Sequence, residues 1–187
     1  MASYQVIPDK TIHEQGPISK AFMDKGINGL HDACGYILQL PYGRTSDKSD
    51  WTLVLIEGRG TCSTKHALIA ALAAELKLDV HLMLGVYPMK ESNTPGAGKV
   101  LDNSGYDFLP EAHCYLEYKG KRIDITGLSS PNAEPINEII LEERIAPAQI
   151  GKYKKDFHQN YIKQWAGKSK FSEIWSLREA CIKALSK

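Results

Sequence analysis

One stretch constrains the fold of this chain more than any other. Gly60 and Thr61, a turn former and a hydroxyl residue suited to capping a helix, precede a long run rich in alanine and leucine. The run is apolar on almost all sides, and its polar residues come late. A helix of this kind must be buried over most of its surface. We therefore expect a central core helix from Cys62 to about Leu78.

Cys62 is the first residue of this predicted helix. The unpaired N–H groups and the dipole of a helix N-terminus favour negative charge, and a thiolate needs such surroundings at neutral pH. Cys62 is thus a candidate nucleophile, provided that the chain supplies a base. The alternative is a buried structural cysteine, because free cysteine is among the most buried residue types.

Composition limits the class of protein. A chain of 187 residues with 43% hydrophobic and 24% charged residues is suited to a single domain spanning residues 1–187. Its net charge of +1 gives no electrostatic reason to expect a nucleic-acid or anionic-membrane partner. We expect no signal peptide and no membrane span. Four scattered cysteines do not form a disulfide framework, so a reduced, cytoplasmic protein is expected. The oligomeric state is not indicated.

The hydrophobic pattern predicts elements on both sides of the core helix. Pro17 suits the first turn of a helix, and the Lys119-Gly120 pair suits a tight turn between two strands. The glycine- and proline-rich stretch 88–110 is unusually long for a loop, a property typical of functional or mobile segments. The pattern predicts helices within 17–40, a strand or helical turn at 51–56, strands at 80–87, 111–118 and 121–126, a loop at 127–135, a helix or short strand at 136–146, and helices within 147–186.

The predicted hairpin at 111–126 places two further polar residues on paired strands. A turn centred near residues 119 and 120 sets residue 113 opposite 126 or close to it, with residue 124 as a diagonal neighbour. One register lets the His113 imidazole and the Asp124 carboxylate meet on the same face. A carboxylate that fixes the ring tautomer would leave the other ring nitrogen for a thiol. Cys62, His113 and Asp124 are therefore candidates for nucleophile, base and orienting residue.

These motifs, in this order, resemble the transglutaminase-like superfamily, which has a papain-like cysteine catalytic core. The resemblance covers roughly residues 51–126: Gly60-Thr61-Cys62 opening a helix, the strand after that helix, a histidine leading the next strand, and Asp124-Ile125-Thr126. It implies that Cys62 is the nucleophile, His113 the general base and acid, and Asp124 its partner. It implies an α+β fold in which a central helix packs on an antiparallel sheet, with extra helices at both ends. The family often has an aromatic residue two positions before the aspartate, where this chain has Arg122.

Some roles stay open. His66 lies one turn after Cys62 and is either a rival base or, with Cys62, a pair of metal ligands. The second oxyanion donor would come from Gln39 or Trp51. Cys114 neighbours His113 but faces the other side of its strand, so we expect it in the core. No cofactor or metal is expected, and the chain has no Asp/Asn-rich loop of the calcium-binding kind.

The predicted activity is thiol-dependent acyl transfer or amide hydrolysis through a thioester. The acyl donor would be a peptide, a protein or a small amide. Water as acceptor would make the protein a peptidase or amidase, and an amine would make it a transglutaminase. The alternative is a non-catalytic binding or scaffold module that retains the fold.

Overall fold

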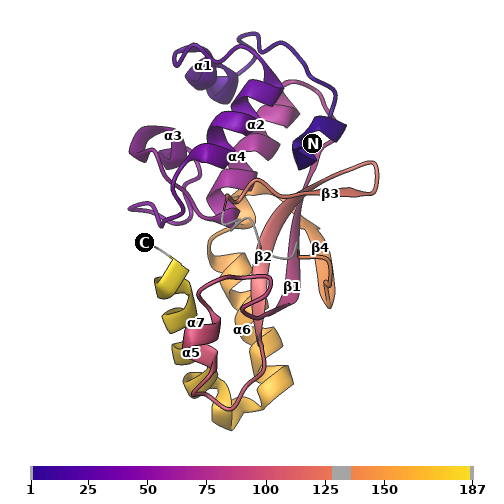
Figure 1. Cartoon of the computed structure of the whole chain (residues 1–187). Helices are drawn as coiled ribbons and strands as arrows, with labels where there is room; N and C mark the ends of the chain where they lie inside the picture. The colour runs from indigo at the N-terminus through magenta and orange to yellow at the C-terminus, as the bar shows by residue number, and fades with distance from the viewer. Residues whose placement is uncertain (1, 128–135, 186–187) are drawn as a thin grey trace. The chain divides into compact units, whose positions relative to one another are not determined.

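The structure, a computed structural model, describes residues 2–127 and 136–185 (Figure 1). These residues form a mixed α+β architecture with seven α-helices and an open, antiparallel, four-stranded sheet in the order β3-β2-β1-β4. The expected α+β class is confirmed. The strands are β1 (His81–Met89), β2 (Leu109–Tyr118), β3 (Lys121–Ile123) and β4 (Leu141–Ile145).

The chain divides into two compact units. The predicted catalytic core at 51–126 contributes residues to both, because β1 and β2 each have residues in both units. This division does not test whether residues 1–187 form a single domain, so the single domain remains a prediction. Unit 1 comprises Met1–Met83, Cys114–Gly127 and Arg144–Gly151; unit 2 comprises Leu84–His113, Leu128–Glu143 and Lys152–Lys187.

Unit 1 is built around α4 (Cys62–Glu75), on which every residue from 62 to 70 is buried. The predicted burial of this helix on most faces is therefore confirmed. Residues 51–56, for which a strand and a helical turn were both open, contribute to the short helix α3. The elements that pack against α4 are α1 (Pro17–Met23), α2 (Leu30–Gln39), α3 (Leu53–Glu57) and the 3₁₀ turn η2 (Pro147–Gln149); a second 3₁₀ turn, η1 (Ser3–Val6), packs against α2.

The core helix ends three residues before the predicted Leu78. Lys77 adopts a left-handed conformation with φ of 56°, and its N–H donates to Ala74 O at 3.0 Å. Leu78 N–H reaches back to Ala73 O at 2.9 Å. This pair of hydrogen bonds is a Schellman motif, which satisfies the last carbonyls of the helix and stops it. Glycine usually occupies the left-handed position, so a lysine there hides the stop in the sequence.

The hairpin has the predicted turn and register. Lys119 and Gly120 both have positive φ, 49° and 76°, as a two-residue hairpin turn requires. Tyr118 pairs with Lys121, and Leu116 pairs with Ile123. However, β3 ends at Ile123, so the predicted strand to residue 126 is too long. The pairing proposed for residues 113 and 126 lies beyond the end of β3.

Unit 2 contains its own hydrophobic core. Helix α7 (Phe171–Leu185) packs against both α5 (Gly98–Leu101) and α6 (Lys152–Ala166). The predicted helices within 147–186 are thus confirmed, although α6 begins only at Lys152. Within 136–146, where a helix or a short strand is expected, residues 141–145 form the strand β4. The loop expected at 127–135 lies outside the described residues, apart from Gly127. A short 3₁₀ turn, η3 (Lys168–Lys170), joins α6 to α7, and the core comprises Tyr87, Met89, Ala97, Leu101, Leu109, Ile162, Ile174, Cys181 and Ile182.

Across residues 2–127 and 136–185, each helix is either too short or too polar to traverse a bilayer.

Candidate active site

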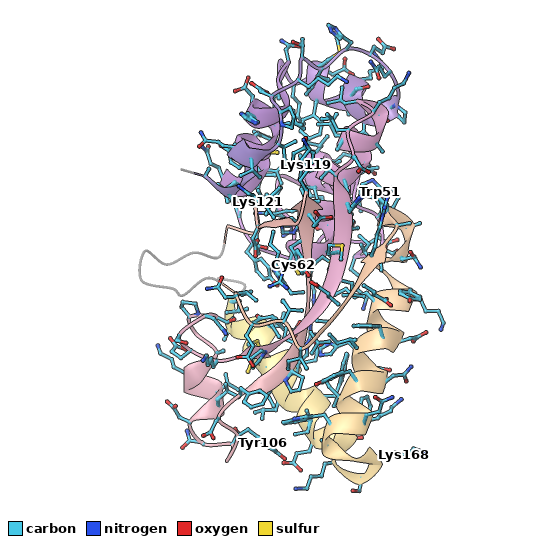
Figure 2. The ribbon with its side chains drawn as sticks, turned by 90° about the vertical axis from the view of Figure 1, so that its right-hand side faces the viewer. Trp51, Cys62, Tyr106, Lys119, Lys121 and Lys168 are labelled. Atoms are coloured by element: carbon cyan, nitrogen blue, oxygen red, sulfur yellow. The ribbon has the colours of Figure 1, made fainter. Side chains whose placement is uncertain are left out.

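Cys62 is the first residue of α4, as predicted. Thr61 adopts an extended conformation before the helix, and its N–H donates to Thr64 Oγ1 at 3.0 Å, one half of a capping box. The cysteine is 8% exposed, and its sulfur lies 3.8 Å from Ser63 Oγ. Figure 2 labels Cys62 and Trp51, both in unit 1. The thiol therefore lies where the helix dipole favours negative charge.

The glycine before this helix is required by close packing. A Cβ atom at Gly60 would lie 2.9 Å from Lys65 Cγ and 3.0 Å from Val54 Cγ2. The backbone of Gly60 also donates to Pro41 O and accepts from Gly43 N–H, both at 3.2 Å. Side-chain packing and two backbone hydrogen bonds thus hold the turn at Gly60 in place, and this sets the direction of the first turn of α4.

His66 is engaged at both ring nitrogens. Nδ1 lies 2.7 Å from Cys62 O, and Nε2 lies 2.8 Å from the backbone nitrogen of Ile125. Because a backbone N–H can only donate, Nε2 carries no proton, and the proton on Nδ1 is donated to the Cys62 carbonyl. A ring with both nitrogens used in this way is not available as a base for the thiol or as a metal ligand.

Asp124 lies directly after β3, with its side chain 42% exposed. Its Oδ1 accepts a hydrogen bond from Thr126 N–H at 2.8 Å and lies 3.5 Å from His66 Nε2. The hydrogen bond two residues along the chain is a local turn stabilised by the aspartate side chain. This turn takes the Thr126 N–H, and side chains of α4 take the Ile125 N–H and the Thr126 carbonyl, so the backbone after Ile123 does not pair with a strand and β3 is shorter than predicted.

His113 belongs to the unit 2 part of β2 and is 5% exposed. Its ring meets Tyr87 edge to face, with centroids 5.7 Å apart, and the Tyr87 hydroxyl lies 2.8 Å from Thr94 Oγ1. Cys114, the next residue, has no exposed surface, as expected of a core residue. Of the three predicted catalytic residues, Cys62 and Asp124 both lie at the ring of His66 within unit 1. Cys62 contacts the ring through its backbone carbonyl and Asp124 through its carboxylate.

Lys65 is a buried charged residue beside Cys62 that was not predicted. It has no exposed surface, and its Nζ donates to Leu40 O at 2.6 Å and to Thr126 O at 2.8 Å. Burial lowers the pKa of the Lys65 ammonium to about 8, while negative charge at Asp124 and Cys62 acts in the opposite direction. A lysine inside an apolar helix, three residues after the cysteine, is a signal that the sequence does contain.

Unit 2 holds a second buried polar cluster, also not predicted. Arg178 on α7 donates to both carboxylate oxygens of Glu111 on β2, at 2.7 Å and 2.5 Å. Burial by itself would raise the pKa of Glu111, but the charge and hydrogen bonds of Arg178 outweigh it and hold the pKa at about 2. His158 Nε2 donates to Pro110 O at 2.8 Å, and burial lowers the pKa of this histidine. The cluster ties α6 and α7 to the strand that carries His113.

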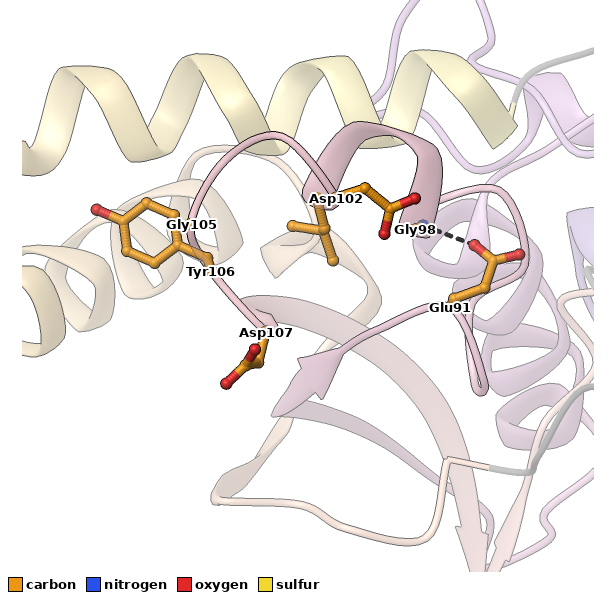
Figure 3. Close-up of a pocket in the computed structure, with 7 residues that line it drawn as sticks. Glu91, Gly98, Asp102, Gly105, Tyr106 and Asp107 are labelled. Carbon is orange, nitrogen blue, oxygen red and sulfur yellow. Dashed lines mark hydrogen bonds between the residues drawn. The ribbon is translucent and has the colours of Figure 1, made fainter.

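The long 88–110 stretch is more ordered than a plain loop and includes a cavity of about 410 Å³ (Figure 3). Glu91 lies at its wall, and its carboxylate accepts from Gly96 N–H at 2.9 Å and from Gly98 N–H at 2.6 Å. A Cβ at Gly98 would lie 2.7 Å from that carboxylate. Asp102 and Asp107 add two more acidic side chains to the lining. The Glu91 carboxylate is thus used to organise the turn before α5.

Within the described ranges 2–127 and 136–185, no three His, Cys, Asp or Glu side chains gather in a way that could hold a metal ion. Comparison of the whole chain with family models, curated proteins and solved structures gives no match.

Proposed function

We propose that the protein is a thiol-dependent acyltransferase or amide hydrolase of transglutaminase-like, papain-related type, with Cys62 as nucleophile, His113 as general base and acid, and Asp124 as the orienting carboxylate. The observation that carries the proposal is the position of Cys62 at the N-terminus of the buried helix α4. A thiol there combines the helix field with the nearby positive charge of Lys65.

The engagement of His66 supports the choice of base. Its two ring nitrogens are occupied by Cys62 O and Ile125 N–H, so the rival base within α4 has no free nitrogen to offer the thiol. His113, the histidine indicated by the motif order, is the base that the proposal requires. Asp124 would keep the His113 imidazole in the productive tautomer and stabilise the imidazolium that forms.

The chemistry proceeds through a thioester. The Cys62 thiolate attacks the carbonyl carbon of the donor, a C–S bond forms, and the carbonyl π electrons move to oxygen. When the tetrahedral intermediate collapses, the C–N or C–O bond breaks and the His113 imidazolium gives its proton to the leaving group. His113 then takes a proton from water or an amine, which attacks the thioester and releases Cys62. Water gives hydrolysis, and an amine gives a new amide.

The negative oxygen of each intermediate needs hydrogen-bond donors. Backbone N–H groups at the start of α4 are one source. Of the two side chains considered for the second donor, Gln39 is exposed, whereas Trp51 Nε1 is a buried donor without an acceptor among the described residues. The Trp51 indole is therefore the better candidate.

An acyl-enzyme experiment tests the proposal. The full chain is mixed with p-nitrophenyl acetate, the release of p-nitrophenolate is followed, and the acetylated peptide is mapped by mass spectrometry. We expect a burst of one equivalent with acetyl on Cys62, and no burst for Cys62→Ser. Adding an amine such as glycinamide then distinguishes the acceptors: amide product indicates transfer, and acetate alone indicates hydrolysis.

The matched control is Cys34→Ala, which removes another buried thiol. Burial raises the pKa of Cys34 to about 12, so this variant should keep the full burst. Acetylation spread over lysines, with the same time course in Cys62→Ser, would reject the catalytic proposal and favour a non-catalytic module.

A further inference from the structure

Two consecutive residues of α4 hold two consecutive residues of the segment that carries Asp124. His66 Nε2 accepts from Ile125 N–H at 2.8 Å, and Lys65 Nζ donates to Thr126 O at 2.8 Å. The contacts run in parallel, one from a ring nitrogen and one from an ammonium. Together they fasten residues 124–126 to the first two turns of the helix that begins with Cys62.

The same two residues also contact the beginning of α4 and the end of α2. His66 Nδ1–H donates to the carbonyl of Cys62 itself, at 2.7 Å, and Lys65 Nζ donates to Leu40 O, at 2.6 Å. The Cys62 carbonyl, the Asp124 segment and the residue that follows α2 are thus linked through Lys65 and His66. A change at either residue therefore acts on both sides of the candidate site.

The hydrogen bonds of Lys65 and His66 to residues 124–126, here called the clamp, lie in a tightly packed region. Gly127 has a φ of 74°, and a Cβ there would lie 2.3 Å from Leu38 O and 3.4 Å from Lys65 Nζ. Any side chain at position 127 would collide with the backbone and crowd the lysine. The glycine is therefore required both by its conformation and by the close approach of residues 38 and 127.

Burying Lys65 and His66 carries a desolvation penalty that a purely structural contact does not need. An ammonium with no exposed surface and a neutral histidine with no exposed surface are both buried here. Apolar side chains of similar size would hold a helix on a neighbouring segment without the desolvation penalty. Buried groups with a perturbed pKa, as Lys65 has, concentrate at functional sites. This combination favours a role in the chemistry of Cys62 over packing alone.

We propose that Lys65 and His66 are positioning residues of the Cys62 site: His66 fixes the backbone of Cys62 relative to the Asp124 segment, and Lys65 fixes Thr126 while placing a desolvated positive charge beside the thiol. This inference rests on the proposed function. The Coulomb attraction between Lys65 and a negatively charged Cys62 is mutual, so the ammonium that is stabilised by the thiolate stabilises the thiolate equally.

The test measures the pH profile of Cys62 alkylation by iodoacetamide in the folded full chain, for the wild type, Lys65→Met and His66→Gln. We expect Lys65→Met to displace the profile upward by about one pH unit, which is about a tenfold lower rate below the midpoint. His66→Gln keeps a hydrogen-bond acceptor but not the ring. It should lower the rate of Cys62 acylation by p-nitrophenyl acetate by about tenfold, with a smaller displacement of the alkylation profile.

Glu75→Gln is the matched control. Glu75 lies at the other end of α4, and its carboxylate accepts from Ile18 N–H at 3.0 Å and Ser19 N–H at 2.6 Å. It thus ties a different segment to the same helix. We expect Glu75→Gln to lower thermal stability without moving the Cys62 profile. A wild-type profile in Lys65→Met and His66→Gln, with a lowered melting temperature, would overturn the inference and leave the proposed function standing.

A second measurement uses the wild type alone and can overturn the inference even if a variant fails to fold. Nitrogen-15 NMR should show His66 as the neutral Nδ1–H tautomer throughout the pH range in which Cys62 titrates. A His66 ring that becomes protonated in that range would refute the clamp. Slow wild-type labelling of Cys62, equal to that of Cys34, would instead reject the proposed function itself.

Discussion

Single residues in unit 1 differ in whether their buried polar atoms have hydrogen-bond partners. His66 has both ring nitrogens hydrogen-bonded, whereas Trp51 Nε1 is buried with no acceptor among the described residues. A buried donor without an acceptor lowers stability by about 1–3 kcal/mol, so such a donor is rare in folded proteins and calls for a functional explanation. An oxyanion that forms only during the reaction would use the Trp51 N–H without stabilising the resting protein.

Trp51→Phe tests this role, because it removes the donor and keeps most of the apolar surface. We expect the acylation rate of Cys62 by p-nitrophenyl acetate to fall by about two orders of magnitude, the usual effect of losing one oxyanion donor. The thermal stability should change little. Gln39→Ala is the control and should react at the wild-type rate. The reverse result, a slow Gln39→Ala and a normal Trp51→Phe, would assign the donor role to Gln39.

At the scale of elements, the contact between β2 and α7 depends on a buried ion pair. Glu111 is 5% exposed and receives two hydrogen bonds from Arg178, which also contacts Glu179 at 2.6 Å. Removing one partner of a buried pair leaves an uncompensated charge, which costs about 3–5 kcal/mol. The more exposed Arg178–Glu179 contact contributes about 1 kcal/mol or less.

Glu111→Gln should therefore lower the free energy of unfolding by about 3 kcal/mol at pH 7, measured by urea denaturation. The pKa of Glu111 is about 2 in the folded protein and about 4.3 in an unfolded chain, so its contribution is complete above about pH 4.5. It is lost as the pH falls from there toward 2. The difference between wild type and Glu111→Gln should shrink over that range.

Glu179→Gln, which affects the more exposed carboxylate on the same arginine, is the control and should change stability by about 1 kcal/mol or less. A difference between wild type and Glu111→Gln that stays constant from pH 7 to pH 3 would show that the Glu111 charge does not stabilise the fold.

The elements also show what local patterns predict. Local signals were sufficient for three elements: the nearly all-apolar composition for α4, the helical spacing of apolar residues for α7, and the Lys119-Gly120 pair for the hairpin turn. The end of α4 was wrong by three residues because a lysine, rather than a glycine, occupies the left-handed position. The length of β3 was wrong because the backbone after Ile123 bonds to side chains from α4, which are distant in sequence.

At the scale of the whole molecule, the mixed α+β class was implied by the resemblance and agrees with the helices and strands that the hydrophobic pattern predicts. The division into two compact units could not, because β1 and β2 contain residues of both and their patterns show no break. Cys62, His113 and Asp124 were indicated by motif order. Lys65 had a sequence signal, its place inside an apolar helix, but its partners are supplied only by the folded chain, and so are those of Glu111.

The central claim is that His113 activates the Cys62 thiol. The most direct measurement is the rate of alkylation by iodoacetamide against pH in the wild type and in His113→Gln, with the modified cysteine mapped. We expect selective labelling of Cys62 below about pH 7 in the wild type, and a profile moved toward that of an ordinary thiol, near pH 8.5, in His113→Gln. Cys34 and Cys181, whose pKa values are raised by burial, should stay unlabelled. Equal, slow labelling of Cys34, Cys62 and Cys181, with the same profile in both proteins, would contradict it.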